Sequence, residues 1–192
     1  MITNIRIGQW ETNSSSCHQI LICGAGVEND EYKFPEKVDI KTGSFGWDFM
    51  CYRSIEGRLS YIVSVLVAHL SNDNDGERLF DEYLNKIKKV MYDNGVKEIT
   101  GPYSAEEMYD NDYALEYYKY EYKDNIRHIP ASVDHVDDYF DSVRELIDDE
   151  NKLKDFLFYG TSMVITGNDN GYNRFDAPES WSIDHELRNK VW

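Results

Sequence analysis

The stretch Ile5–Cys23, IRIGQWETNSSSCHQILIC, decides how this chain is organised. Two short runs with an apolar residue at every second position flank a polar centre, and a period of two is typical of β-strands. We therefore predict an N-terminal β-hairpin within residues 1–26, which presents its polar centre at one end.

The polar centre is richer than a turn requires. Asn and Ser favour turns because their side chains bond to nearby backbone, which explains two or three of these residues. It does not explain Glu11 on one side and His18 on the other, with three serines between them. We take the centre as a candidate site for metal-free RNA cleavage, which needs an acid, a base and groups that stabilise the phosphate charge.

In this hypothesis Glu11 and His18 are the acid and base, and Arg6 binds the phosphate bidentately. The other substrate-binding candidates are Asn13, Ser14, Ser15 and Ser16. The pattern does not fix whether Arg6 and His18 share a face of the sheet. The alternative is a solvated turn with His18 packed at the strand edge.

Two accessory candidates lie later in the chain. His135 stands beside Asp134 and Asp137, and a neighbouring carboxylate often orients a catalytic histidine. Asp169 lies in GNDNG, which also predicts a turn. The alternative is that both are simply polar residues at strand ends and turns.

Other kinds of site lack their sequence patterns. There is no G-x-S-x-G, and Gly24 and Gly26 form only GAG, without the rest of a phosphate-binding fingerprint. Cys17 and His18 are adjacent, so on a strand they face opposite sides and are poorly placed to share one ion. We expect no metal and no cofactor.

The charge restricts the possible partners. Lys and Arg number 20 against 36 Asp and Glu, so the formal net charge is −16. A bare polyphosphate is repelled by such a surface. The chain is therefore expected either to bind a small molecule or a protein, or to reach nucleic acid through a basic partner. Solubility alone is the simpler explanation of the acidity.

Three cysteines without C-x-x-C spacing, and no leader pattern, favour a reduced, cytoplasmic protein. The longest apolar run, Tyr61–Leu70, is too short to span a bilayer, so we expect no membrane association.

The 192 residues fit one domain of the α+β class, with the hairpin joined to a mixed or antiparallel sheet packed by three or four helices. Apolar residues recur at helical spacing after Ser54, a predicted N-cap, and the helix that follows is expected to be central. The other predicted helices cover residues 79–91, 136–147 and 153–157. The predicted strands include 38–40, at an edge, and 162–166.

The segment 103–125 is interpreted as a surface insertion. Ser104 and Glu107 resemble a capping box and predict a short helix, after a short strand at 96–100. Residues 109–123 hold six tyrosines among acids and lysines, which fits either an exposed helix or a ribbon. Such a surface also suits contact with a basic protein.

The motif R-x-G-x-W-E-T-N-S-S-S-x-H, together with FGW at 45–47, Asp134–His135 and SMVITGNDNG at 162–171, resembles a family of small proteins of phages and other mobile elements. The likeness extends to type II-A anti-CRISPR proteins that truncate the single guide RNA held by a Cas nuclease, with an N-terminal hairpin needed for cleavage. Cys17 stands where that family usually has Thr.

The resemblance implies an anti-defence protein in the bacterial host cytoplasm, which acts as an endoribonuclease only with its Cas partner. It agrees with the charge, because an acidic protein reaches RNA more easily on a basic effector. The first alternative is a non-enzymatic inhibitor that binds a basic nucleic-acid-binding protein. The second is an enzyme acting on nucleotides, with a pocket lined by Glu11, His18 and His135.

Overall fold

The structure is a computed structural model and describes residues 2–7, 16–23, 35–46, 50–109, 115–121, 126, 129, 131–160 and 162–168. For residues 2–7, 16–17, 23, 103–109, 115–121 and 168 it describes the backbone alone.

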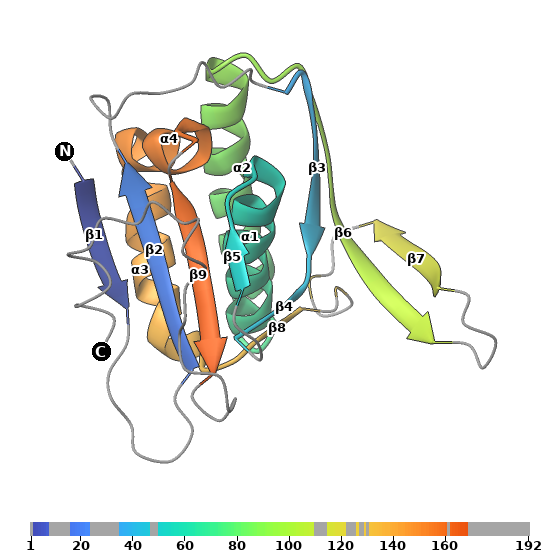
Figure 1. Ribbon diagram of the computed structural model, residues 1–192. Coiled ribbons are helices and arrows are strands. Elements are labelled where there is room, and N and C mark those ends of the chain that lie inside the picture. The colour runs from blue at the N-terminus through green and yellow to red at the C-terminus, as the bar shows by residue number, and fades with distance from the viewer. Residues whose placement is uncertain are drawn as a thin grey trace.

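Four helices and nine strands are present in the described residues (Figure 1). The strands are β1 (Ile2–Ile7), β2 (Ser16–Cys23), β3 (Lys37–Thr42), β4 (Ser44–Phe45), β5 (Met50–Tyr52), β6 (Glu98–Tyr109), β7 (Leu115–Glu121), β8 (Ser132–Val133) and β9 (Met163–Asn168). The helices are α1 (Ile55–Leu70), α2 (Gly76–Asp93), α3 (Val136–Asp148) and α4 (Glu150–Phe158). The predicted α+β class is confirmed.

The strands form three sheets. The largest has the order β1-β2-β9-β5 and is antiparallel throughout, so the predicted hairpin of β1 and β2 forms one side of it. A second sheet has the order β3-β6-β7, with β3 parallel to β6 and β7 antiparallel to it. The third pairs β4 with β8 in parallel. The set is therefore mixed, and β3 is an edge strand as predicted.

Helix α1 is the central helix, as its wide apolar surface predicts. Ser54 caps it, with Oγ accepting a hydrogen bond of 3.0 Å from the Gly57 N–H. Leu59, Ile62 and Leu66 have no exposed surface. The helix contacts α2, α3 and α4 and also β3 and β9. Each such side chain contributes about 1.5–3 kcal/mol when fully buried, so α1 organises the core.

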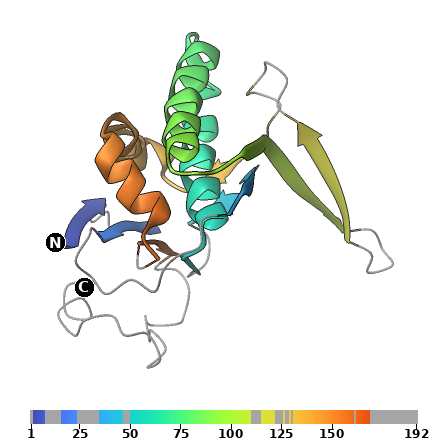
Figure 2. The same ribbon diagram turned by 90° about the horizontal axis from the view of Figure 1, so that it is seen from above.

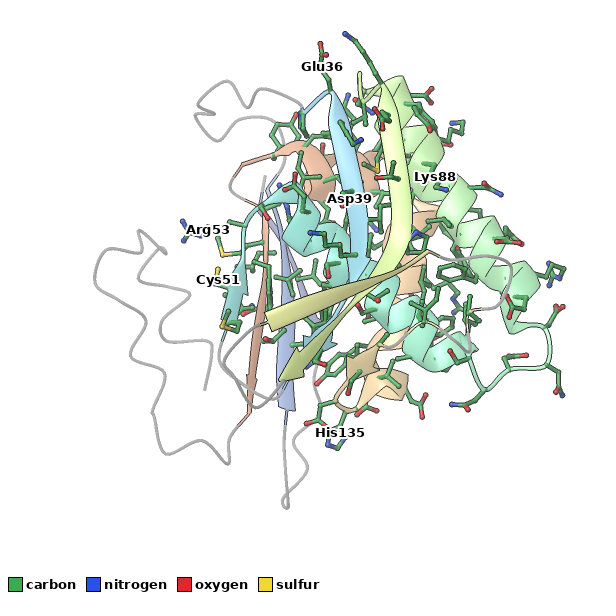
Figure 3. The ribbon with its side chains drawn as sticks, turned by 90° about the vertical axis from the view of Figure 1, so that its right-hand side faces the viewer. Glu36, Asp39, Cys51, Arg53, Lys88 and His135 are labelled. Atoms are coloured by element: carbon green, nitrogen blue, oxygen red, sulfur yellow. The ribbon has the colours of Figure 1, made fainter. Side chains whose placement is uncertain are left out.

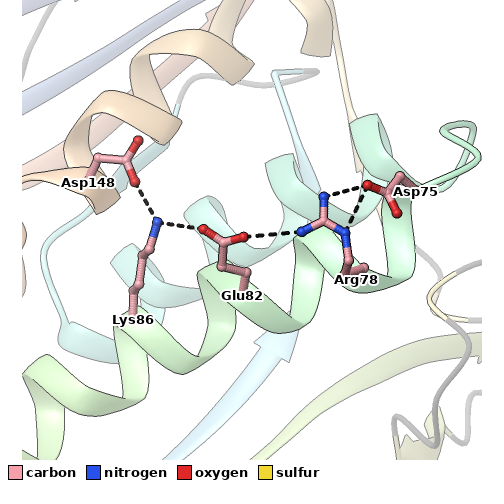
Figure 4. Close-up of polar contacts among 5 residues, drawn as sticks. All are labelled: Asp75, Arg78, Glu82, Lys86 and Asp148. Atoms are coloured by element: carbon pink, nitrogen blue, oxygen red, sulfur yellow. Dashed lines mark hydrogen bonds and ion pairs between the residues drawn. The ribbon is translucent and has the colours of Figure 1, made fainter.

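Ion pairs join α2 to the junction of α3 and α4. Lys86 Nζ lies 3.0 Å from Glu82 and 2.8 Å from Asp148, and Glu82 also pairs with Arg78, which binds Asp75 (Figure 4). These pairs are exposed to solvent, which weakens them, so they add little to stability. Of the pairs named, Lys86–Asp148 connects α2 to the end of α3.

A buried arginine ties α1 to the end of α4. Arg58 has no exposed surface, and its Nη1 donates to the carbonyls of Tyr159 at 2.7 Å and Ser162 at 2.8 Å. Nη2 donates to the Leu157 carbonyl at 3.0 Å. Carbonyls at a helix C-terminus lack partners within the helix, and a cation there is favourable. The chain turning from α4 into β9 is thus held to the central helix.

The segment after α2 differs from the prediction. Residues 104–107 lie inside β6, so the predicted short helix at Ser104 and Glu107 is wrong. Residues 104–107 all pair with β7, and Ser104 also pairs with Thr42 of β3. This pairing satisfies the backbone and outweighs a local capping signal. Of the two forms expected for residues 109–123, the ribbon is present, since β6 and β7 form a hairpin that extends away from the helices (Figure 2). Its interpretation as an insertion stays a prediction.

Candidate functional site

His18 is packed inside the molecule. It lies on β2, opposite Ile7 of β1 and opposite Thr166 of β9, so a strand flanks it on each side. Its side chain has an exposed fraction of 0%. The predicted position in a strand beside the polar centre is therefore correct, and the ring lies in the core.

Two tyrosines surround the ring. His18 Nδ1 lies 3.0 Å from the hydroxyl of Tyr61 on α1. The ring stacks on Tyr139 of α3, with centroids 4.1 Å apart and planes 8° from parallel. A buried hydroxyl usually finds a hydrogen-bond partner, and Tyr61 finds one in His18. The contacts join β2 to two helices.

The other ring nitrogen faces backbone. His18 Nε2 is buried and has no hydrogen-bond partner among the described residues. A Cβ built on Gly46 would lie 2.5 Å from Nε2 and 2.8 Å from the Asp134 Cβ. Gly46 also has a φ of 98°, which side-chain-bearing residues rarely adopt. Only glycine fits between His18 and Asp134.

Burial sets the charge of His18. Burial, and to a smaller extent the neighbouring charge of His135, lower the pKa of the imidazole from 6.5 to about 3. The ring is therefore neutral near pH 7. Either neutral tautomer leaves Nε2 unpaired, as a donor without an acceptor or as an acceptor without a donor.

His135 lies at the surface next to this cluster. It is the N-cap residue of α3 with a left-handed φ of 53°, and about a third of its side chain is exposed. Its ring nitrogens are 3.8 Å from Asp134 Oδ1 and 3.9 Å from Asp138 Oδ2. Figure 3 shows it at the end of the molecule away from Glu36. Asp134 is thus a neighbour of the ring, as expected, and Asp138 is the second one; Asp137, the other expected neighbour, instead lies 2.8 Å from His69.

Strand ends gather beside His18. Ile7 ends β1 opposite His18, Ser16 begins β2 opposite Asn168, and Asn168 ends β9. The chain therefore enters and leaves the predicted polar segments at one end of the sheet (Figure 1). Segments 8–15 and 169 onward lie outside the described residues, and with them Glu11, Asn13, Ser14, Ser15 and Asp169.

Arg6 takes a different place. The register sets it opposite Gln19, one position from the Ile7–His18 pair. Because successive residues of a strand face opposite sides, positions 6 and 18 belong to different faces of the sheet. Among the predicted site residues, His18, His135 and the Ser16 backbone are thus described at one end. Their assigned roles stay predictions.

The sequence did not single out Gly46, Tyr61 and Tyr139 as neighbours of His18. Tyr139 fits the apolar pattern of its helix, and Tyr61 lies inside the most apolar helix. A buried tyrosine hydroxyl needs a partner, and a histidine on a strand is a suitable one. That signal identifies candidates without fixing the pair.

No group of three or more His, Cys, Asp or Glu side chains that could hold a metal ion occurs within the described part of the chain. Cys51 is a free thiol, 3.6 Å from the sulfur of Met163. None of the described helices combines the length and the apolar character needed to cross a membrane.

Comparisons with models of protein families, with curated proteins and with solved structures gave no match.

Proposed function

We propose that this is an anti-defence protein that causes truncation of guide RNA held by a Cas nuclease. The supporting observation is spatial. Four segments carry the resemblance, and they are far apart in the chain. The first contains His18, and each of the other three has a described part beside it: Phe45–Gly46, Asp134–His135 and Thr166.

Direct contacts connect these parts. Gly46 lies between His18 and Asp134, and the Asp134 N–H donates to the Phe45 carbonyl at 3.0 Å. Thr166 faces His18 across the sheet. Segments that contribute to one site must meet in space. Their meeting supports a shared role at this end of the sheet.

The buried ring favours one role of His18 over another. A general base must come within about 3 Å of the proton it removes, and His18 has no exposed surface. In the described conformation the ring anchors β2 to α1 and α3. Catalysis by His18 then needs an opening of this packing, and Glu11 stays the predicted acid-base group.

The test follows guide RNA on a denaturing gel, incubated with the protein in the presence and absence of a type II-A Cas nuclease. We expect shortened RNA only with the nuclease. Glu11→Gln is expected to abolish truncation. Tyr61→Phe removes only the hydroxyl that binds His18, and it separates the role of His18 as a base from its role as a structural anchor. A folded variant that truncates the RNA more slowly indicates a base that Tyr61 orients. His69→Gln is the matched histidine control. Intact RNA in every wild-type lane contradicts the proposal.

The acidic, non-enzymatic inhibitor is the second candidate, favoured by the burial of His18 and the net charge of −16. An inhibitor that occupies a basic channel needs no reactive group. Its signature is inhibition in proportion to the amount of protein, weakened by salt, with the guide RNA at full length.

A further inference from the structure

The hairpin of β6 and β7 leaves the rest of the molecule. We call residues 103–121 the outer arm; its strands are described over 103–109 and 115–121. The first part of β6 pairs with β3, from Glu98 to Ser104. Beyond that point β6 pairs with β7 alone (Figures 1 and 2).

No layer of the described structure covers the outer arm. β3 packs on α1, whereas β7 has its extensive contacts with β6 only. A two-stranded ribbon without a third strand or a helix against it is marginally stable in water. A long ribbon kept in this position therefore suits a surface that another molecule covers.

The outer arm has a distinct chemistry. Its sequence holds six carboxylates, one lysine and six tyrosines. The register divides its paired positions between two faces, because residues opposite each other on antiparallel strands share a face. One face holds positions 104, 106, 108, 116, 118 and 120, which are Ser, Glu, Met, Glu, Tyr and Tyr, without a basic residue.

In the rest of the chain, several carboxylates are paired with basic side chains. At the base of the same sheet Lys37 binds Glu98 at 2.5 Å, and Lys97 binds Glu36 at 2.6 Å. On α2, Arg78, Lys86 and Lys89 bind carboxylates of the same helix. One lysine cannot neutralise six carboxylates, so the outer arm keeps an excess of negative charge that a basic surface complements.

We propose that the outer arm docks into a groove of a partner protein lined by lysine and arginine, of the kind that holds nucleic acid. Tyrosines give contact area at low entropic cost and accept arginine side chains on their faces. The carboxylates of the outer arm bind the lysine and arginine side chains that otherwise bind the phosphates of a nucleic acid. The identity of the partner as a Cas nuclease rests on the proposed function; the use of the arm as the docking element is the new inference.

Three variants test the arm. In the trimmed variant Asn-Gly replaces residues 105–119, since this dipeptide closes a tight hairpin between paired strands; Ser104 and Tyr120 are such a pair. The neutralised variant changes four acids of the arm to glutamine. These are Glu106, Glu107, Glu116 and Glu121.

A matched control removes the same charge from the helices. It combines Glu56→Gln, Asp81→Asn, Asp93→Asn and Glu145→Gln, at exposed positions of α1, α2 and α3. Circular dichroism confirms that each variant is folded. Binding to a type II-A Cas nuclease loaded with guide RNA is measured by biolayer interferometry at low and at physiological ionic strength.

We expect the trimmed variant to lose binding and the neutralised variant to associate at least about tenfold more slowly at low salt, with the control close to wild type. Arm variants that bind like wild type overturn the docking role and leave the proposed function standing. Equal weakening of the control overturns it too, because net charge then explains the effect. A wild-type protein that does not bind overturns the proposed function and this inference with it.

The mass of the protein in solution tests the remaining alternative, in which the outer arm binds a second copy of the chain. A dimer that becomes a monomer in the trimmed variant would assign the outer arm to a second copy of the chain, and would overturn a basic partner. We expect the same mass for both proteins.

Discussion

The region around His18 and the outer arm treat polar residues in opposite ways. Around His18, two helices and three strands enclose one imidazole, which is neutral and tightly packed. In the outer arm, four carboxylate and five tyrosine positions belong to two strands that no layer of the described structure covers. Burial fixes the properties of a polar group from within the molecule, whereas exposure leaves them to be set by a partner.

The largest effect on stability is expected at Arg58, a polar side chain that is fully buried, like His18. Arg58→Met leaves the carbonyls of Leu157, Tyr159 and Ser162 without their donor. Removing one partner from a buried polar cluster costs about 3–5 kcal/mol of unfolding free energy. Chemical denaturation measures it. Arg144→Met, which breaks an exposed pair with Asp141, is expected to cost below about 1 kcal/mol; equal costs would contradict the burial argument.

Gly46 tests the packing against His18. Gly46→Ala combines a left-handed φ with a Cβ placed 2.5 Å from His18 Nε2. Gly95 has the same φ of 98° but no atom within 4 Å of the added Cβ. Gly95→Ala is expected to cost about 1–2 kcal/mol, and Gly46→Ala about 1–3 kcal/mol more. Thermal unfolding compares the stability of the two variants. Equal losses of stability would show that the His18 side chain moves away from the added Cβ at little cost.

The pH dependence tests the neutral imidazole. An unfolded chain binds a proton at His18 below pH 6.5, but the folded protein binds it only near pH 3. Acid therefore favours the unfolded chain, and stability falls through this window as pH decreases. The loss is about 1.4 kcal/mol per pH unit at most.

Urea denaturation at pH 7 and pH 5 measures this loss. The slope should disappear in His18→Gln and persist in His69→Gln, whose ring lies in the last turn of α1 and stacks on Phe140. A wild-type protein equally stable at both pH values would contradict the buried, neutral state of His18.

The smallest effect is expected from the outer arm. Replacing residues 105–119 by Asn-Gly keeps the β3–β6 pairs and removes no described core residue. The unfolding free energy is expected to change by less than about 1 kcal/mol, because shortening a connection alters loop entropy only slightly. Chemical denaturation checks this. A large loss would show that the outer arm supports the body, and the contrast between the two regions would disappear.

Periodicity made much of the fold predictable. The four helices follow their apolar spacing, and Ser54 caps α1 as expected. The hairpin forms where the alternation predicts it, although all five residues from His18 to Ile22 are buried, so burial along β2 does not alternate. Residues 103–121 lack a clean period because tyrosine, glutamate and lysine fit either a strand or a helix surface. The prediction of a short helix at Ser104 was wrong because a local capping pattern carries no information about β3 and β7, the strands that pair with β6.

The surroundings of His18 were less predictable for a related reason. Its neighbours come from positions 43 and 148 residues away, at Tyr61 and Thr166. Register and helix packing bring them together, and neither is encoded within a local window. The sequence did place His18 on a strand beside the polar centre, and Asp134 beside His135.

The place of β9 has a consequence for synthesis on the ribosome. β9 lies between β2 and β5, and Ile20 pairs with Val164. At 5–20 residues per second, β2 waits roughly 7–30 s for this neighbour to be translated. Until then one edge of a strand with Ile20, Leu21 and Ile22 has no native partner. The nascent chain thus carries an aggregation-prone segment that a chaperone has time to bind.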